Sequence, residues 1–189
     1  MDRTGELAAA ALRLVTAGGL PAVTFRSVAA ESGWSLGAVQ KTFPTKDALI
    51  RATLSYAQAT IALQVSVDPG RPTLRAWLVE LVMATLPLDD ARRSACLVSV
   101  AVSDRAPFDP EVAHSLAGWD AEVRGNLARL AGRARHEGEL HPEVDGENLA
   151  RAVLAFAAGL AGQLLYDPVD EATVLALVQS TMAALTPGL

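Results

Sequence analysis

The stretch SGWSLGAVQKTFPTK, residues Ser32–Lys46, carries the signals for one short helix between two turns. Gly33 supplies a turn, Ser35 is a favourable N-cap, and Pro44 prevents the new helix from continuing. Thr45 is then a suitable N-cap for the helix that follows. A helix of this length buries little apolar surface, so we infer that its sequence serves a purpose other than building a core.

Two helices are expected before this stretch and one long helix after it. Residues 4–17 place apolar side chains on one face and end at a pair of glycines. Thr24 is a good N-cap for a second helix over Phe25–Ser32. After the short helix, residues 46–67 carry the apolar pattern of one long helix, which ends before a turn at residues 68–70.

Breaks rich in proline and aspartate divide the rest of the chain into five further helices. These are expected at Pro72–Leu86, Asp89–Asp104, Pro110–Gly138, Gly146–Tyr166 and Glu171–Leu185. No segment alternates apolar and polar residues as a strand does. The sequence therefore predicts an all-α protein, in which an N-terminal three-helix domain, residues 1–48, is joined by a continuous helix to a larger helical domain, residues 49–189.

The composition is typical of a folded protein in a reducing compartment. Hydrophobic residues make up 51% and charged residues 20% of the 189 residues, which excludes a disordered chain. The single cysteine, Cys96, excludes an internal disulfide and indicates a cytoplasmic location, and its apolar neighbours favour a buried thiol over a redox sensor. Glu6 and Arg13 interrupt the N-terminal apolar run, which argues against a signal peptide. The most apolar window, residues 152–165, is too short to span a bilayer, so we expect no membrane partner.

Charge is distributed unevenly along the chain. The formal net charge is −5, yet residues 1–52 contain six Lys or Arg and four Asp or Glu, a formal charge of +2. The other residues contain ten Lys or Arg and seventeen Asp or Glu, a formal charge of −7. The N-terminal quarter is therefore the part of the chain that a polyanion would approach.

Two short helices joined through Gly33 form the arrangement that places a recognition helix in the major groove of DNA. From Ser35 to Phe43 the second helix spans ~13 Å, which is about the width of that groove. Val39 and Phe43 lie four residues apart and are expected to anchor this helix to the two before it. The alternative is a helical hairpin within a bundle, but the caps, the turn, the short helix and the lysines together favour DNA binding.

Nine residues are candidates for DNA contact, either on the outward faces of the short helix or near a helix N-terminus. Gln40 can hydrogen-bond to a base edge, and Leu36 or Ala38 can contact a thymine methyl group. Gly37, like Ala38, permits close approach to the duplex. Phosphate contacts are expected from the remaining polar candidates, which are Arg26, Ser35, Lys41, Thr42 and Lys46.

Over about its first fifty residues the sequence resembles the TetR family of transcriptional regulators. The matching residues are Thr24, Val28, Ala29, Gly33, Trp34, Ser35, Gly37, Val39, Phe43, Pro44, Thr45, Lys46 and Leu49. The chain departs from the family at Gln40, where tyrosine is usual, and at Thr42, where histidine is frequent. The family's tyrosine commonly contacts the phosphate backbone, whereas a glutamine can bind either a phosphate or adenine, so no base preference is transferred to this chain.

The resemblance implies a homodimer that represses transcription from a pseudo-palindromic DNA operator. The family generally pairs its last two long helices in the dimer, and a two-fold dimer presents two recognition helices to two half-sites. In this chain residues 149–165 are apolar on nearly every side and carry small residues that allow close helix contact. The alternative for this segment is a wholly buried helix in a monomer.

The resemblance also implies a small-molecule effector that binds in the C-terminal domain and weakens DNA binding. The candidate pocket residues are Tyr56, Trp77, Met83, Phe108, Trp119 and Phe156. Each of them can instead serve only core packing. The effector itself is not identified by the sequence.

Other function classes have less support. A protein that binds or sequesters a small molecule without an operator is the main alternative, and an activator is a further one. An enzyme is not expected, because the chain lacks GxSxG, HExxH and phosphate-binding glycine motifs. His136 and His141 lack the i, i+4 spacing of helical metal ligands, so we expect neither a metal nor a cofactor.

Overall fold

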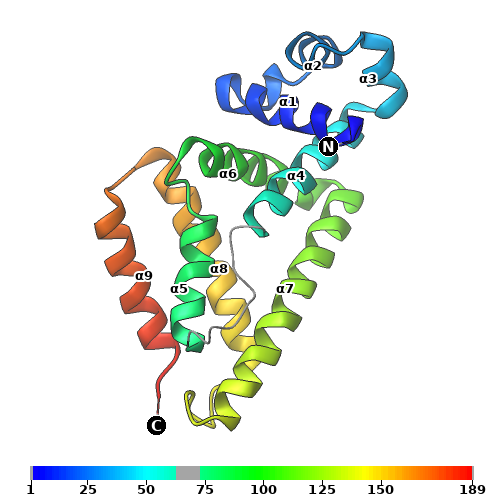
Figure 1. Ribbon diagram of the computed structural model, residues 1–189. Coiled ribbons are helices and arrows are strands. Elements are labelled where there is room, and N and C mark those ends of the chain that lie inside the picture. The colour runs from blue at the N-terminus through cyan, green and yellow to red at the C-terminus, as the bar shows by residue number, and fades with distance from the viewer. Residues whose placement is uncertain (1, 63–72, 189) are drawn as a thin grey trace. The chain divides into compact units, whose positions relative to one another are not determined.

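The computed structural model describes residues 2–62 and 73–188, and over these residues the chain is helical without strands (Figure 1). The described helices are α1 (Arg3–Gly18), η1 (Leu20–Ala22), α2 (Phe25–Ser32), α3 (Leu36–Thr42), α4 (Lys46–Ala62), α5 (Leu74–Thr85), α6 (Asp90–Ser103), η2 (Ala106–Phe108), α7 (Pro110–His136), α8 (Gly146–Tyr166) and α9 (Glu171–Leu185). The all-α prediction is confirmed. The two 3₁₀ helices, η1 and η2, were not expected from the sequence.

The helix boundaries agree closely with those expected from caps and breaks. Helices α2, α8 and α9 have the predicted bounds, and the others differ by a few residues at their ends. The long helix predicted over residues 46–67 is described as far as Ala62. Its last part, the turn at residues 68–70 and the predicted helix start at Pro72 lie outside the described residues.

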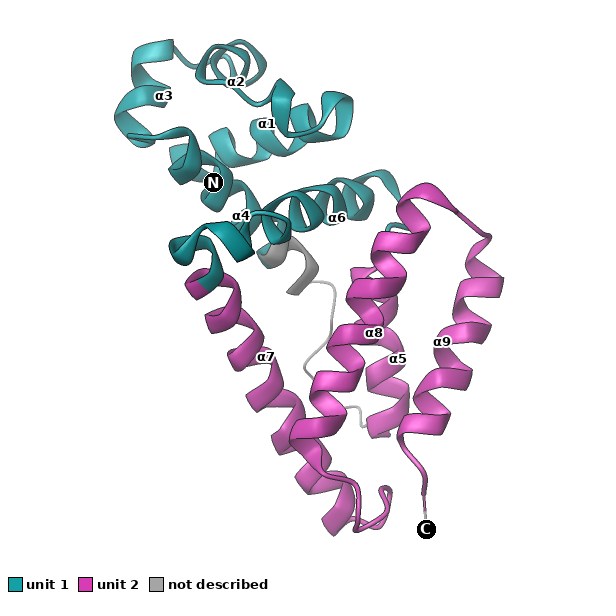
Figure 2. Ribbon diagram, turned by 180° about the vertical axis from the view of Figure 1, so that it is seen from behind, with its two compact units in different colours: residues 1–64, 87–113 teal, residues 65–86, 114–189 magenta. Residues whose placement is uncertain are grey.

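The chain divides into two compact units (Figure 2). Unit 1 comprises residues 1–64 and 87–113, and unit 2 comprises residues 65–86 and 114–189. The DNA-binding domain predicted at residues 1–48 lies within unit 1, which adds α4 and α6 to it. The domain boundary at residue 48 stays a prediction.

In unit 1, helix α1 is the central element and packs against α2, α4 and α6. Leu7, Val28 and Leu49 are fully buried, and each comes from a different helix. Between α1 and α6, the hydroxyl groups of Thr16 and Ser94 form a hydrogen bond. The three N-terminal helices therefore share one core with α4 and α6.

In unit 2, helix α5 packs against α8 and α9. Leu78 and Val82 on α5 and Val178 and Met182 on α9 are fully buried. Arg75 ties the start of α5 to the end of α9, because its Nη2 donates a 2.6 Å hydrogen bond to the carbonyl oxygen of Thr186. An apolar interface and a polar anchor together hold these helices.

Helix α8 has 21 residues and is long and apolar enough to cross a membrane by length and composition alone. The helix is longer than the apolar window over residues 152–165, on which the expectation of no membrane span was based. Leu149, Val153 and Leu160 are nevertheless buried inside unit 2. The apolar character of α8 is thus accounted for in part by packing within the folded unit.

Candidate nucleic-acid interface

The caps predicted around the short helix are present. Thr24 Oγ1 accepts a 3.0 Å hydrogen bond from the Ser27 amide at the start of α2. Ser35 Oγ accepts one of 3.2 Å from the Ala38 amide at the start of α3. Gly33 ends α2 with φ at +75°, a backbone conformation that residues with a Cβ rarely adopt. Local capping therefore defines the turn and the beginning of α3.

Helix α3 is anchored by two apolar side chains and exposes most of the rest. Val39 is fully buried, and Phe43, which caps the helix at its C-terminal end, is 4% exposed. Leu36, Gln40 and Lys41 are exposed. The predicted anchoring by Val39 and Phe43 is confirmed. The other residues of α3 contribute little to the core.

The structure places the nine candidate DNA contacts on α2, at the start of α4, and on α3 with its N-cap. The exposed ones are Arg26, Ser35, Leu36, Gly37, Gln40, Lys41 and Lys46, and the half-buried ones are Ala38 and Thr42. Thr42 Oγ1 donates a 2.9 Å hydrogen bond to the carbonyl oxygen of Ala38. Its hydroxyl proton is thereby committed to the helix backbone, so Thr42 is less suited than its neighbours to hold a phosphate.

Trp34 lies between α2 and α3 in the sequence, and its side chain binds a residue of α1. Its side chain is 38% exposed, and its Nε1 donates a 3.0 Å hydrogen bond to Glu6 Oε2 on α1. The guanidinium carbon of Arg3 lies 5.6 Å from the centre of the tryptophan ring. Trp34 thus brings a basic residue of α1 towards the N-cap of α3, an arrangement that sequence spacing could not reveal.

Two arginines of unit 1 are paired with acidic residues, whereas two lysines at or near α3 are exposed. Arg13 forms a 2.6 Å ion pair with Glu31, and Arg51 forms one of 3.1 Å with Glu111. Both guanidinium charges are therefore balanced within the protein. The side chains of Lys41 and Lys46 are exposed on α3 and at the start of α4, where they can meet an anion.

The candidate pocket residues lie in different parts of the fold. Tyr56 belongs to unit 1 and is half-buried on α4, whereas Trp77, Met83 and Phe156 are half-buried in unit 2. Trp119, on α7, is 38% exposed. Phe108, on η2, is 88% exposed. Such a surface position does not suit the lining of an enclosed pocket within this chain.

Cys96 is 6% exposed on α6, in agreement with the expected buried thiol. Burial raises the pKa of this thiol to about 11, so it is protonated at neutral pH and a poor nucleophile. Over the part of the chain that the structure describes, no three His, Cys, Asp or Glu side chains are grouped as metal ligands.

Two short helices joined at a positive-φ glycine, the second one largely exposed, define a helix-turn-helix protein. Residues 7–53 match the family described as "Bacterial regulatory proteins, tetR family", and residues 72–187 match "BetI-type transcriptional repressor, C-terminal". The chain therefore belongs to the TetR family of transcriptional regulators. Members of this family are generally ligand-responsive and typically form homodimers in the cytoplasm.

Individual relatives resemble the chain over nearly its whole length. The nicotine-responsive transcriptional repressor HdnoR of Paenarthrobacter nicotinovorans is 24% identical over 175 residues, which cover 90% of this chain and 87% of the relative. The crystal structure of a transcriptional regulator from Rhodococcus sp. RHA1 superimposes with a TM-score of 0.81 at 25% identity, covering 100% of both chains. A regulator from Saccharomonospora viridis, solved in complex with choline, has a TM-score of 0.75 at 19% identity and covers 96% of this chain and 93% of its own.

Proposed function

We propose that the protein is a homodimeric cytoplasmic repressor that binds a pseudo-palindromic operator and is released from it by a small-molecule effector. The observation that carries this proposal is the exposed surface of α3, which is held in place by the buried side chains of Val39 and Phe43. A seven-residue helix with one buried position adds little to the core. Its exposed glycine, glutamine and lysine instead suit close contact with a duplex.

In the proposed complex the two kinds of DNA contact have separate roles. Gln40 lies on the exposed part of α3 and can hydrogen-bond to a base edge in the major groove. Lys41 and Lys46 neutralise phosphates, and the positive formal charge of residues 1–52 favours their approach to DNA. Phosphate contacts orient the protein, and contacts to the bases select the sequence.

The proposed dimer pairs α8 and α9 with the same helices of a second copy. Ala155, Ala158 and Gly159 on α8 are exposed, and Leu177 on α9 is 47% exposed. A Cβ built at Gly159 meets nothing within 4 Å, so packing within the chain does not require glycine there. Small residues beside an exposed leucine favour close helix pairing between two copies.

The proposed effector site lies in the helical domain over residues 49–189, and we propose no catalytic activity for it. Trp77, Met83 and Phe156 remain the best candidates for its walls because they are half-buried in one unit. The relative HdnoR is described as nicotine-responsive, and the regulator from Saccharomonospora viridis was solved in complex with choline. These two compounds are therefore the first effectors to test.

A fluorescence-anisotropy titration tests the operator. The purified protein is titrated against DNA that flanks its own gene and against a scrambled duplex of equal length, at two salt concentrations. We expect tighter binding to the flanking DNA that persists at the higher salt concentration. Equal, salt-sensitive binding to both would direct the search to a duplex selected from a random pool. No binding to any duplex at low salt would favour the alternative, a protein that sequesters a small molecule.

A further inference from the structure

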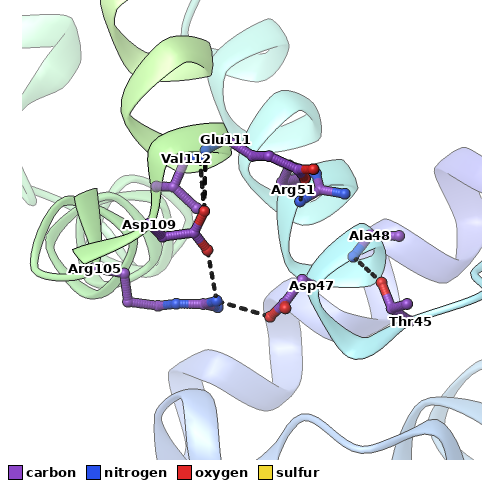
Figure 3. Close-up of polar contacts among 8 residues, drawn as sticks. All are labelled: Thr45, Asp47, Ala48, Arg51, Arg105, Asp109, Glu111 and Val112. Atoms are coloured by element: carbon purple, nitrogen blue, oxygen red, sulfur yellow. Dashed lines mark hydrogen bonds and ion pairs between the residues drawn. The ribbon is translucent and has the colours of Figure 1, made fainter. Parts of the chain in front are cut away.

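One arginine of unit 1 bridges two acidic residues that lie far apart in the sequence (Figure 3). Nη2 of Arg105 lies 2.9 Å from Asp47 Oδ1 and 3.2 Å from Asp109 Oδ2. Asp47 is in the first turn of α4, and Asp109 directly precedes α7. The guanidinium group thus links the beginnings of two helices.

Asp109 is fixed on both of its carboxylate oxygens. While Oδ2 binds Arg105, Oδ1 accepts hydrogen bonds from the Glu111 and Val112 amides at 3.1 and 3.2 Å. Asp109 therefore acts as the N-cap of α7 and as the acceptor for the bridge. A second link joins the same helices, because Glu111 Oε2 lies 3.1 Å from Arg51 Nη1 on α4 (Figure 3).

The other end of the bridge lies next to the DNA-binding surface. Only residues 43–45 separate the end of α3 from the start of α4. Phe43 in this connection is buried, and Thr45 Oγ1 accepts a 3.1 Å hydrogen bond from the Ala48 amide, which caps α4. The position of the first turn of α4 therefore constrains α3 through a short connection.

Helix α7 is one unbroken helix, whose first residues belong to unit 1 and whose remainder belongs to unit 2. We propose that Arg105 is a positioning residue for DNA binding, which holds the first turn of α4, and with it α3, in a fixed relation to the start of α7. Through this bridge, a change at the start of α7 would reach α3. The inference rests on the proposed function, because it concerns regulation of the same DNA-binding surface.

Two simpler roles for Arg105 make different predictions. A partly exposed ion pair that serves only stability would alter unfolding without altering the preference for one duplex. A direct phosphate contact would weaken binding to all duplexes and lower the salt dependence by about one counterion. A positioning residue instead lowers specific binding while the salt dependence stays as in the wild-type protein.

The first test needs no DNA and measures hydrogen exchange of the intact protein by mass spectrometry. In Arg105→Ala we expect faster exchange in two peptides at once, one that includes Ala48 and one that includes Val112. Arg13→Ala is the matched control, because it removes another exposed ion pair of unit 1 that involves neither α4 nor α7. Faster exchange confined to the Val112 peptide would overturn the proposal, because α4 would then not depend on the bridge.

The second test compares the affinity for a duplex selected by the wild-type protein with that for a scrambled duplex. Arg105→Ala is expected to lower this ratio about threefold to tenfold, with partial recovery in Arg105→Lys. Asp47→Asn should lower the ratio similarly, and the double variant should be no worse than either single one. Additive effects, or an unchanged ratio in a folded Arg105→Ala protein, would refute the bridge. A wild-type protein that prefers no duplex would refute the proposed operator instead, and the hydrogen-exchange result would still decide the role of Arg105.

Discussion

Helices α3 and α8 both begin at a side-chain N-cap, but they differ in how much of their surface is buried. Helix α3 has seven residues with Val39 alone buried, and caps at both ends define it. Helix α8 has 21 residues, of which seven are buried, so packing defines it. The contrast shows that the core uses one position of α3 and seven positions of α8.

Both helices also carry a glycine that the fold does not need. A Cβ built at Gly37 on α3, or at Gly159 on α8, would meet nothing within 4 Å. Alanine is the better helix former at such positions. The proposed DNA contact of α3 would explain Gly37, and the proposed dimer contact of α8 would explain Gly159. The predictions below test this comparison of a capped helix with a packed one.

The largest expected effect concerns the anchor of α3. Phe43→Ala should destabilise the protein by about 3–5 kcal/mol, because it removes a buried aromatic ring from the short connection between α3 and α4. Phe108→Ala is the matched control, since that ring is 88% exposed, and its stability should stay near that of the wild type. Urea unfolding followed by circular dichroism measures both. Similar stability losses in the two variants would show that α3 is not anchored through Phe43.

The next effect concerns the exposed face of α3 and leaves the fold intact. Gln40→Ala should reduce discrimination between the operator and a one-base variant by about 1–3 kcal/mol, because it removes a contact to a base edge. Lys46→Ala should weaken binding to all duplexes and lower the salt slope by about one. Anisotropy titrations at several salt concentrations separate the two results. A uniform loss of affinity in Gln40→Ala would assign this residue to the phosphates.

Signals within a few residues of one another made much of the fold predictable. Thr24, Gly33, Ser35 and Thr45 act on backbone groups in their own turns, so helix type and boundaries follow from the sequence. The buried positions of Val39 and Phe43 follow from helical spacing in the same way. The remaining positions of α3 were therefore expected to be exposed.

Interactions between distant segments could not be predicted in this way. Trp34 binds Glu6, and Arg105 binds Asp47, through pairings that become visible only once the helices are packed. The exposure of Phe108 was missed for a related reason, because it depends on the η2 turn, which was not expected from the sequence. The inclusion of α6 in unit 1 likewise depends on its packing against α1 and α4.

A smaller effect is expected at the N-cap of α3, where stability and DNA binding can be separated. Ser35→Ala should cost about 1 kcal/mol of stability, because the Ala38 amide loses its acceptor. Ser35→Asp should keep the cap and nearly all the stability, yet weaken DNA binding, because it places a negative charge near the phosphates. Thermal unfolding and anisotropy on the same samples give both quantities. Undiminished DNA affinity in Ser35→Asp would remove Ser35 from the proposed interface.

The smallest effects are expected at the two glycines, and their direction is informative. Gly159→Ala should stabilise the isolated chain by up to about 1 kcal/mol through helix propensity, and Gly37→Ala by less, because Gly37 lies in the first turn of α3. Gly37→Ala should nevertheless weaken operator binding, and Gly159→Ala should raise the dissociation constant of the dimer in analytical ultracentrifugation. Gly118→Ala on α7 is the control, because its Cβ also meets nothing within 4 Å and only stability should change. If all three variants are more stable but operator binding and dimer dissociation are unchanged, then Gly37 is not needed for DNA binding and Gly159 is not needed for the dimer. The exposed faces of α3 and α8 would then need a different explanation.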